Sequence, residues 1–552
     1  MNRFTKKEEH LGARPGRMLW IVGVVLLVCV AAFFRMRSMM VKSEDSYAAT
    51  AQTKSTKTLT VYGMRGTIYD TNMVPLAYDR TSYNVAFYRD PSKASEAYRA
   101  SYTQVILKTI ELVEAMGKST VSDFWLVKND KGQWVFDTGS GSETVEAKRK
   151  TQWAGNFYLT NYPEDQWYDL LLEKYQIPSG LDEETIVQVL AVWQASRMSA
   201  YTSQPVVIAE DVGFECVTRI EAIAVDLDGI SVQTSSQRVY PQGSTACHAI
   251  GYVSKIYDDA SMETYKAKGY PNDATVGVAG IEYSMEDQLS QYVVYRQGRR
   301  QVEVDTRGKV VREISYTEPQ DGSSVVLTID VDLQAAMKEA LQSTINSIHR
   351  EQVTLVESES WQRKHREELA KYEEQGREIS MATTGAIVAM DPYSGIVLGM
   401  VSLPDFDLKI FEGGVSNSEW SAIQNNEDNP LYNRCISAKD SPGSIFKLCT
   451  ALGALAEGDL TLDERISDEG GFMLTDPTDP PRCWTRDISA HQNQTIVEGI
   501  KNSCNYFFYT IGYRMGMEKI NKWAAALGLT SKTNIELPSE STSFVGNRTT
   551  LY

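Results

Sequence analysis

The chain has 552 residues, of which 42% are hydrophobic and 23% charged, a composition typical of folded globular proteins. This length exceeds one ordinary hydrophobic core, so we expect about two to four domains. The formal net charge of −17 argues against a nucleic-acid partner, because binding to a phosphate backbone requires clustered Lys and Arg residues.

An apolar run near the N-terminus predicts a transmembrane helix. Residues 18–34 carry no charge, and arginines flank them on both sides. The run is short for a bilayer core of about 30 Å, but flanking arginines can extend to the interface. More Lys and Arg residues precede the run than follow it closely, which predicts a cytoplasmic N-terminus. We expect a cytoplasmic tail over 1–17, a membrane helix over 18–37 and a linker over 38–60.

Two other targeting signals fit this region less well. A cleaved signal peptide could use "SYAATA" at 46–51, but this stretch lies far from the apolar run. "LLVC", ending at Cys29, is similar to a lipoprotein signal, but valine occupies a position that needs a small residue. We therefore interpret Cys29 as a packing residue of the membrane helix.

Residues 61–320 alternate β-rich runs with amphipathic helical stretches, which predicts an α+β domain. "VYGMRGTIYDTNMVPLAYD" contains two short β-rich segments around an Asp-Thr-Asn turn, and "ISVQTSSQRVYPQGSTACHAIGYV" returns to strand character. Within this domain, Glu282 and Arg65 can form a structural ion pair. A turn at Asp321–Gly322 precedes the strand-like "SSVVLTID", so we place the domain boundary near residue 320.

The second domain, residues 321–552, contains a highly charged segment at 349–378. The segment lacks proline and its apolar positions sustain no heptad, so we expect a solvated helical insertion rather than a partner-binding coiled coil. The next stretch, "TTGAIVAMDPYSGIVLGMVS", has two apolar runs separated by "DPYSG". This pattern predicts a β-hairpin that is buried on at least one face.

The heptapeptide "SPGSIFK", from Ser441 to Lys447, combines a hydroxyl and an amine at the start of a predicted helix. Pro442 and Gly443 interrupt the chain, and apolar residues then follow at helical spacing. Residues three apart share a helix face, so the Ser444 hydroxyl and the Lys447 amine can come within hydrogen-bonding reach. A neutral lysine can take the serine proton, and free N–H groups at a helix N-terminus can hold an oxyanion.

Ser-x-x-Lys arises often by chance, so this interpretation needs a second element. Ser503 and Asn505 lie in "GIKNSCNYFFYTIG", where a serine can relay a proton and an asparagine can bind a peptide-like substrate. The same two residues can instead cap a helix N-terminus, and both roles can coexist. The two patterns in this order are much more specific than either one alone.

The motifs resemble those of the class B penicillin-binding proteins, membrane-anchored transpeptidases that cross-link bacterial peptidoglycan. "RGTIYDTNMVPLA" is similar to the family's Arg-Gly-x-Ile-x-Asp-Arg-Asn-Gly-x-x-Leu-Ala element, with Thr71 and Met73 in place of the usual arginine and glycine. "RVYPQGSTACHAIGYV" and "GVAGIEYSMEDQL" resemble two further pedestal motifs. "LTIDVDLQ" resembles the entry into the transpeptidase domain, and "GAIVAMDPYSGIVLGMVSLPDFD" resembles its first hairpin. The resemblance extends over nearly the whole chain from the membrane segment onward.

The resemblance implies a fold with one N-terminal transmembrane helix and two extracytoplasmic domains. An α+β pedestal, or dimerisation domain, would cover 61–320. An α/β penicillin-binding transpeptidase domain, an antiparallel sheet flanked by helices, would begin at 321. The protein would be a single-pass protein of the bacterial cell membrane, with a SEDS-family glycosyltransferase and other cell-wall machinery as partners.

The resemblance also implies a reaction and residue roles. Acyl transfer would run from a stem peptide ending in D-Ala-D-Ala to an amine on a neighbouring strand, and β-lactam antibiotics would bind covalently. Ser444 would be the acylated nucleophile, Lys447 the base, Ser503 a proton relay and Asn505 a substrate contact; the identity of the base is disputed among penicillin-recognising enzymes. No cofactor or metal is implied.

One family motif is missing from the sequence. The third motif, Lys-Thr/Ser-Gly on a strand lining the cleft, is imitated only by "SKTN" at 531–534, where Asn534 replaces the glycine. We interpret Lys532 as a surface residue and expect a C-terminally truncated transpeptidase domain. Two alternatives stay open. A non-catalytic pedestal scaffold for a membrane glycosyltransferase is favoured by the missing motif, and a β-lactam sensor or hydrolase is disfavoured by the long pedestal.

The remaining polar residues suggest no other chemistry. Seven cysteines show no Cys-x-x-Cys spacing and five histidines no His-Glu-x-x-His pattern, so we expect no metal site. We expect free buried thiols, with a Cys483–Cys504 bridge as the alternative, and interpret His248 as a packing or hydrogen-bonding residue. Asp405 and Asp407 in "LPDFD" could suggest the paired carboxylates of a glycosidase, but the neighbouring proline favours a loop cap.

Overall fold

The protein is described here by a computed structural model. The described residues are 15–42, 56–90, 93–129, 131–139, 143–198, 205–256, 259–271, 274–304, 310–415, 417–473, 479–543 and 545–546. Most of the expected cytoplasmic tail (1–17) and much of the expected linker (38–60) lie outside them. The chain divides into two compact units, Met1–Gly63 with Val294–Asp321 and Met64–Val293 with Gly322–Tyr552.

The first unit combines one long helix with a small antiparallel sheet. Helix α1 (Pro15–Lys42) contains the apolar run, and side chains such as Leu27 and Phe33 are exposed. None of the helices in the described ranges is long and apolar enough to cross a membrane. The transmembrane helix expected over 18–37 stays a prediction. The sheet has the strand order β1-β10-β11 (Thr56–Val61, Gly298–Val304, Val310–Thr317).

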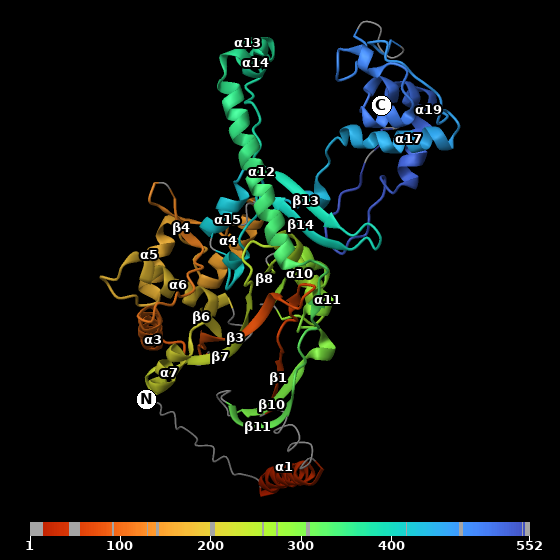
Figure 1. Cartoon of the computed structure of the whole chain (residues 1–552). Coiled ribbons are helices and arrows are strands. Elements are labelled where there is room, and N and C mark those ends of the chain that lie inside the picture. The colour runs from red at the N-terminus through yellow and green to blue at the C-terminus, as the bar shows by residue number, and fades with distance from the viewer. Residues whose placement is uncertain are drawn as a thin grey trace, which may run out of the picture. The chain divides into compact units, whose positions relative to one another are not determined.

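A five-stranded sheet forms the framework of the second unit (Figure 1). Its long strand β3 (Pro75–Phe87) pairs antiparallel with β7 (Ile230–Val239), from Tyr78 opposite Val239 to Phe87 opposite Ile230. The remaining order is β12-β2-β3-β6, in which β12 is parallel to β2. These strands are β2 (Ile68–Tyr69), β6 (Val206–Ala209) and β12 (Val325–Val326).

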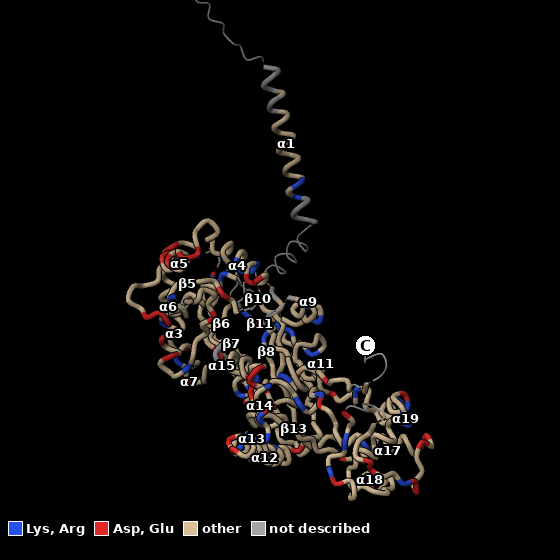
Figure 2. The backbone as a smooth tube through the Cα atoms, turned by 90° about the horizontal axis from the view of Figure 1, so that it is seen from above, with Lys and Arg blue, Asp and Glu red and all other residues tan. Residues whose placement is uncertain are grey.

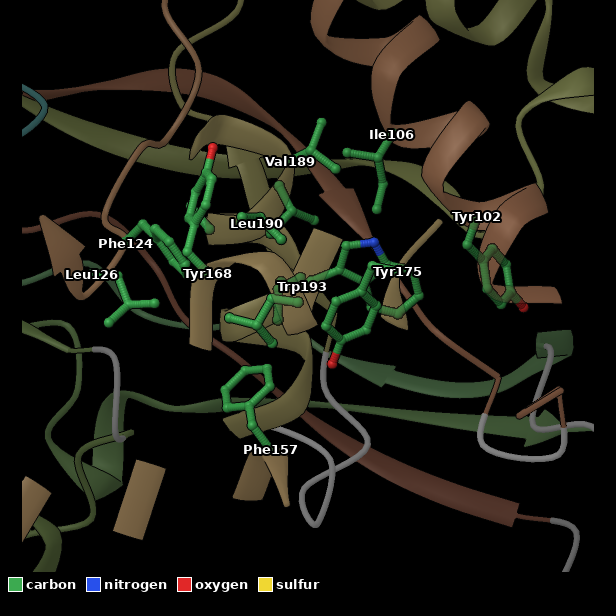
Figure 3. Packing of buried hydrophobic residues seen from close by; sticks show 14 of the residues in the cluster. Tyr102, Ile106, Phe124, Leu126, Phe157, Tyr168, Tyr175, Val189, Leu190 and Trp193 are labelled. Carbon is green, nitrogen blue, oxygen red and sulfur yellow. The ribbon is translucent and has the colours of Figure 1, made fainter. Parts of the chain in front are cut away.

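Helices pack beside this sheet on a core that is rich in aromatic residues. Tyr175 stacks on Trp193 with ring centroids 4.4 Å apart, and Figure 3 shows both among the buried side chains. The Trp153 indole donates a hydrogen bond to Gln194 at 2.9 Å, so this buried polar group is satisfied. The surrounding elements are α3 (Glu96–Glu114), α4 (Glu143–Phe157), α5 (Trp167–Lys174), α6 (Glu183–Met198), α7 (Phe214–Ala222), and the hairpin β4 (Leu126–Lys128) and β5 (Trp134–Phe136).

Five charged side chains form a buried network in the same unit. Arg65 Nε lies 2.7 Å from Glu282 Oε2, with side-chain exposures of 4% and 0%, which confirms the ion pair anticipated from the sequence. Arg65 also contacts Glu286 at 2.7 Å, and Arg238 contacts Glu282 at 2.7 Å and Asp79 at 3.2 Å. Burial opposes the charge of Arg65, but attraction to Glu282 and Glu286 outweighs burial and raises the pKa of the guanidinium.

Short elements position this network. They are α8 (Cys247–Ile250), β8 (Val253–Lys255), α9 (Asp259–Ala267), β9 (Thr275–Gly277), α10 (Gly280–Ser284) and α11 (Glu286–Leu289). Gly280 has φ +57°, and a Cβ there would lie 2.5 Å from the backbone nitrogen of Gly251, so this close approach requires glycine. Glu282 is thereby brought to Arg65 and Arg238 from a distant part of the sequence.

The expected hairpin follows as β13 (Gly385–Met390) and β14 (Val397–Leu403), paired antiparallel from Gly385 opposite Leu403. Helix α12 (Val331–Glu357) packs on it, and Met400 N–H donates to Gln334 Oε1 at 2.8 Å. The side chain of Asp330 caps this helix by accepting hydrogen bonds from the Asp332 and Leu333 N–H groups. β14 is mostly buried, as expected, whereas much of β13 is exposed.

The segment expected as a charged insertion, 349–378, consists of the end of α12 followed by α13 (Glu359–Lys364) and α14 (Arg366–Glu374). Throughout α13 and α14, which are fully described, no residue is buried. In Figure 2 the backbone tube is coloured for acidic and basic residues along this segment. Its exposure and mixed charge fit a solvated helical segment.

The C-terminal part is a helical cluster. Helices α17 (Lys447–Ala456) and α19 (Asn505–Ala526) pack closely at Gly453, where a Cβ would lie 2.5 Å from Met515 Cε. The other elements after β14 are η4 (Leu408–Phe411), α15 (Asn417–Gln424), α16 (Arg434–Ser437), η5 (Gly443–Phe446), η6 (Ile488–His491) and α18 (Ile496–Lys501). From residue 331 onward, the hairpin supplies all strands within the described ranges, so the sheet of the expected transpeptidase fold is seen only in part.

Candidate active site

Ser444 lies on a tight turn that leads directly into α17. Gly443 has φ +57°, a left-handed conformation that glycine adopts without strain, and Ser444 then lies in the 3-10 turn η5. The sequence predicted Ser444 at the start of a regular helix, whereas α17 begins three residues later at Lys447. The serine is exposed and therefore accessible to a large substrate.

Lys447 directs its amine toward the second sequence element. Its Nζ donates to Ser503 O at 2.8 Å, to Ser503 Oγ at 3.0 Å and to Asn505 Oδ1 at 2.6 Å. These three bonds match the three donors of an ammonium group. The amine also lies 5.5 Å from the centre of the Phe508 ring. The two sequence motifs, which are far apart in the chain, thus meet at one amine.

Ser503 connects Lys447 to Ser444. The Ser503 hydroxyl donates to Ser444 Oγ at 3.1 Å while it accepts from Lys447. The spacing of three residues predicted a direct contact between Ser444 and Lys447, but within the described parts of the chain Ser503 links them instead. Lys447 Nζ already donates to two oxygens of Ser503 and to Asn505 Oδ1.

The turn before α19 holds Ser503 in an unusual conformation. Ser503 has φ +47°, which costs a non-glycine residue about 1–3 kcal/mol. Cys504 is the N-cap residue, and its sulfur accepts from the Phe507 N–H. The alternative that Ser503 or Asn505 caps this helix is therefore wrong, and both side chains face Lys447 instead. A strained backbone with polar side chains directed at one point is typical of functional sites.

Burial lowers the pKa of the Lys447 amine from its ordinary value, and the nearby thiols of Cys483 and Cys504 act in the opposite direction. A lowered pKa increases the fraction of neutral amine at a given pH. Neutral amine is the form that can accept a proton from a serine hydroxyl.

A buried cluster behind the site was missed by the sequence reasoning. Asp468, Cys483, His491 and Cys504 place one possible ligand atom each within 4.8 Å of one another. Cys483 Sγ lies 3.2 Å from His491 Nδ1, and Asp468 Oδ2 has no hydrogen-bond partner among the described residues. Two thiols, an imidazole and a carboxylate are donor types that bind zinc tetrahedrally. Their irregular spacing, which contains no Cys-x-x-Cys pair, explains why no motif revealed them.

The thiols in this cluster are not bridged. The Sγ atoms of Cys483 and Cys504 are 3.9 Å apart, and both cysteines are free. Burial raises the pKa of the Cys504 thiol to about 11. Five of the seven cysteines are buried free thiols, which confirms the expectation for these five, while Cys29 is exposed and Cys435 half-buried.

The other polar residues singled out in the sequence have structural contacts. His248 Nε2 lies 2.7 Å from Pro430 O, and its ring packs against Phe406, which confirms the packing interpretation. Asp405 pairs with Lys338 at 2.5 Å, and Asp407 caps η4 by accepting from the Lys409 N–H.

The segment that imitates the third motif has no strand structure. Residues 531–534 lie outside any helix or strand, and Lys532 is exposed, as expected of a surface residue. Asn534 has φ +62° and donates its N–H to Glu540 at 3.2 Å. "SKTN" therefore does not form the strand edge on which the family's third motif lies.

The chain is similar in sequence to two protein-family models and to several known proteins. The family model "Penicillin-binding Protein dimerisation domain" matches residues 60–327, and "Penicillin binding protein transpeptidase domain" matches residues 385–550. "Peptidoglycan D,D-transpeptidase MrdA" of Acinetobacter baumannii is 28% identical over 331 residues, 60% of this chain and 42% of the relative. "Stage V sporulation protein D" of Bacillus subtilis is 29% identical over 329 residues, 59% of this chain and 40% of the relative.

Solved structures show the same fold over most of the chain. A complex between Penicillin-Binding Protein (PBP2) and MreC from Helicobacter pylori has a TM-score of 0.56 at 20% identity, covering 90% of this chain and 70% of that one. A peptidoglycan synthase complex has a TM-score of 0.52 at 21% identity, covering 97% of this chain and 71% of that one. The chain spans 42% to 43% of the length of the first curated relatives that it matches.

Proposed function

The chain belongs to the class B penicillin-binding proteins, with MrdA-like dimerisation and transpeptidase domains, and on this premise we propose that it is a serine-type peptidoglycan D,D-transpeptidase. The observation that carries the proposal is the hydrogen-bonded link from Ser444 through Ser503 to Lys447, with distances of 3.1 and 3.0 Å. This link connects the candidate nucleophile to an amine whose pKa is lowered by burial.

In the proposed first step, Ser444 Oγ attacks the carbonyl carbon of the penultimate D-Ala of a stem peptide. In this step Lys447 is neutral, so its amine has a free lone pair and accepts from the Ser503 hydroxyl, which accepts in turn from Ser444. The Ser444 proton passes to Ser503 Oγ while the Ser503 proton passes to Lys447. Cleavage of the peptide bond then releases the terminal D-Ala, whose amine takes up a proton from Lys447. An ester on Ser444 is the product.

In the second step, an amine on a neighbouring strand attacks this ester. The attacking amine gives one proton to neutral Lys447, a new amide forms, and the C–O bond of the ester breaks. The Ser444 oxygen is reprotonated from Lys447 through Ser503. Asn505 accepts from Lys447 through Oδ1, so its Nδ2 can donate to a substrate carbonyl. We assign part of the oxyanion hole to the Ser444 backbone N–H, which lies at the start of the turn into α17.

The proposal extends to location and partners. The apolar run of α1 would anchor the protein in the bacterial cell membrane, with its N-terminus in the cytoplasm and the bulk outside. A SEDS-family glycosyltransferase and other cell-wall proteins would be partners. This is supported by the similarity to a PBP2 that was solved with MreC and to a peptidoglycan synthase complex that coordinates polymerization and crosslinking.

Labelling with a fluorescent penicillin tests the proposal in the full-length protein. We expect covalent labelling that Ser444→Ala abolishes, because the acyl-enzyme ester needs that hydroxyl. Ser441→Ala is the matched control, since it removes an exposed serine three residues earlier, and it should label normally. A Ser444→Ala variant that labels like the wild type would disprove the nucleophile assignment.

The lifetime of the label separates the proposal from its rivals. We expect the acyl-enzyme to persist for many minutes, because the link supplies no carboxylate that activates water. Rapid release of hydrolysed penicillin would instead identify a β-lactam hydrolase, and no labelling of the wild type would identify a non-catalytic scaffold.

A further inference from the structure

Trp484 is unusually exposed for a tryptophan next to a candidate active site. The residue is 68% exposed, whereas the preceding residue, Cys483, is buried. Tryptophans are on average highly buried because their large apolar rings are costly to hydrate. Cys483 Sγ lies 3.9 Å from the sulfur of Cys504, the residue that directly follows Ser503, so Trp484 is next to a residue that packs close to the site.

The indole is nevertheless held in place on one side. Its Nε1–H donates to Asn502 O at 3.1 Å, and its ring meets His491 edge to face with centroids 5.7 Å apart. His491 itself is buried in the cluster behind the site. Trp484 therefore has one edge anchored against the protein while most of its surface faces solvent.

The anchor point lies next to the proton link. Asn502 immediately precedes Ser503, whose hydroxyl lies 3.1 Å from Ser444 Oγ. The carbonyl oxygen of Ser503 is held by Lys447 at 2.8 Å, and that of Asn502 by Trp484. The indole and the amine thus hold successive carbonyl groups of the same turn.

We propose that Trp484 is a specificity-determining residue whose exposed indole surface packs against the apolar part of the acyl donor at Ser444; this inference rests on the proposed function. A ring that is already anchored loses little conformational entropy on binding. Contact with it favours acyl donors that carry an apolar or aromatic side chain over donors that lack one. The donor class is therefore a peptide or β-lactam with an apolar group beside the reacting carbonyl.

The test compares two penicillins in the full-length protein. Benzylpenicillin carries an aromatic acyl side chain, and 6-aminopenicillanic acid has the same nucleus without it. The second-order rate of acylation is measured with each for the wild type, Trp484→Ala and Trp484→Phe. A substitution that changes the reactivity of Ser444 in general affects both rates equally and leaves their ratio unchanged. Tyr393→Ala is the control, because Tyr393 is 98% exposed in the turn of the β13–β14 hairpin.

We expect Trp484→Ala to reduce the preference for benzylpenicillin up to about tenfold, since one aromatic contact contributes about one factor of ten or less. Trp484→Phe keeps an aromatic ring but loses the bond to Asn502, and it should retain most of the preference. Tyr393→Ala should leave the ratio unchanged. If Trp484→Ala does not fold, Trp484→Leu carries the same expectation of a reduced ratio.

Other outcomes overturn the inference. Equal losses for both penicillins in the Ala and Phe variants would make Trp484 a positioning residue for Ser503, acting through Asn502. An unchanged ratio in every variant would remove Trp484 from substrate contact. Absence of labelling at Ser444 in the wild type would defeat the proposed function itself. A wild type that labels at Ser444, with variants that keep the wild-type rate ratio, would defeat only this inference.

Discussion

Arg65 in the buried network and Lys447 at the candidate active site show two uses of a cation in one chain. Arg65 is surrounded by carboxylates, which outweigh its burial and raise its pKa. Among the described residues, Lys447 donates to neutral oxygens of Ser503 and Asn505 alone, and burial lowers its pKa. The charge of the hydrogen-bond partners, rather than burial alone, therefore decides whether a cationic side chain stays protonated or can lose its proton.

The difference between the two cations is tested most directly by replacing Lys447. We expect Lys447→Met to lower the second-order rate of acylation by a penicillin about 10²- to 10⁴-fold, the usual contribution of a general base. The apolar methionine has a similar length, so the unfolding midpoint should change little. Rapid-quench labelling gives the rate, and thermal unfolding gives the midpoint.

Lys439→Met provides the control for the Lys447 variant, because Lys439 is exposed and lies only a few residues before Ser444. It should acylate at the wild-type rate. If Lys447→Met also acylates at that rate, Lys447 is not the base. A large loss of stability in Lys447→Met would mean that this amine, like Arg65, is mainly structural.

The second test removes the carboxylate at the centre of the buried network. Glu282→Ala leaves Arg65 and Arg238 without their shared partner, and we expect the free energy of unfolding to fall by about 3–5 kcal/mol. Urea denaturation measures this change. Unfolding at the wild-type midpoint would show that the remaining carboxylates compensate both cations.

The network also predicts a pH dependence of stability. Burial alone would raise the pKa of Glu282, but Arg238 and Arg65 outweigh it and lower the pKa below the ordinary 4.5. Because the folded-state pKa is lowered, this contribution is present above pH 4.5 and is lost as the pH falls through the folded value. Glu282→Ala should therefore lose less stability than the wild type on acidification below pH 4.5.

A third test uses the pH dependence of acylation. Because Lys447 acts as a base only when neutral, the rate should rise by up to about tenfold per pH unit until the amine is deprotonated. Burial lowers its pKa from 10.5, so the rise should level off below pH 10.5. Lys447→Met should lack this rise. A wild-type rate that is constant over the same range would contradict the role of a titrating amine.

The sequence predicted well those features of the fold that follow from a local pattern of residues. The β-hairpin at 385–403 and the exposed helices of 349–378 follow from apolar alternation and charge. Ser444, Lys447, Ser503 and Asn505 were selected as candidate site residues because two short motifs occur in a fixed order, and their roles stay predictions. The structure brings the four residues together. The Arg65–Glu282 pair joins positions 217 residues apart, and it was anticipated because both residues lie in recognisable pedestal motifs.

Other features depend on how distant segments pack, and they could not be predicted. The spacing of Ser444 and Lys447 suggested a direct contact, but the 3-10 turn and the φ of +47° at Ser503 place the Ser503 hydroxyl between them. The four buried side chains around Cys483 have no regular spacing. Their convergence is set by the loop before α18 and by the start of α19.

The smallest expected effect concerns an ion pair in the first unit. This pair is exposed, so it tests whether burial decides how much an ion pair stabilises the protein. Arg312 and Glu303 face each other on β11 and β10 with Nε and Oε2 2.5 Å apart, and their side chains are 71% and 35% exposed. Water screens both charges, so Arg312→Ala should change the free energy of unfolding by only about 0–1 kcal/mol. Urea denaturation at low and at high salt measures the effect, which should shrink as salt is added. A loss as large as that of Glu282→Ala would mean that charge pairing stabilises this chain regardless of burial, and the distinction drawn from Arg65 and Lys447 would then lose its physical basis.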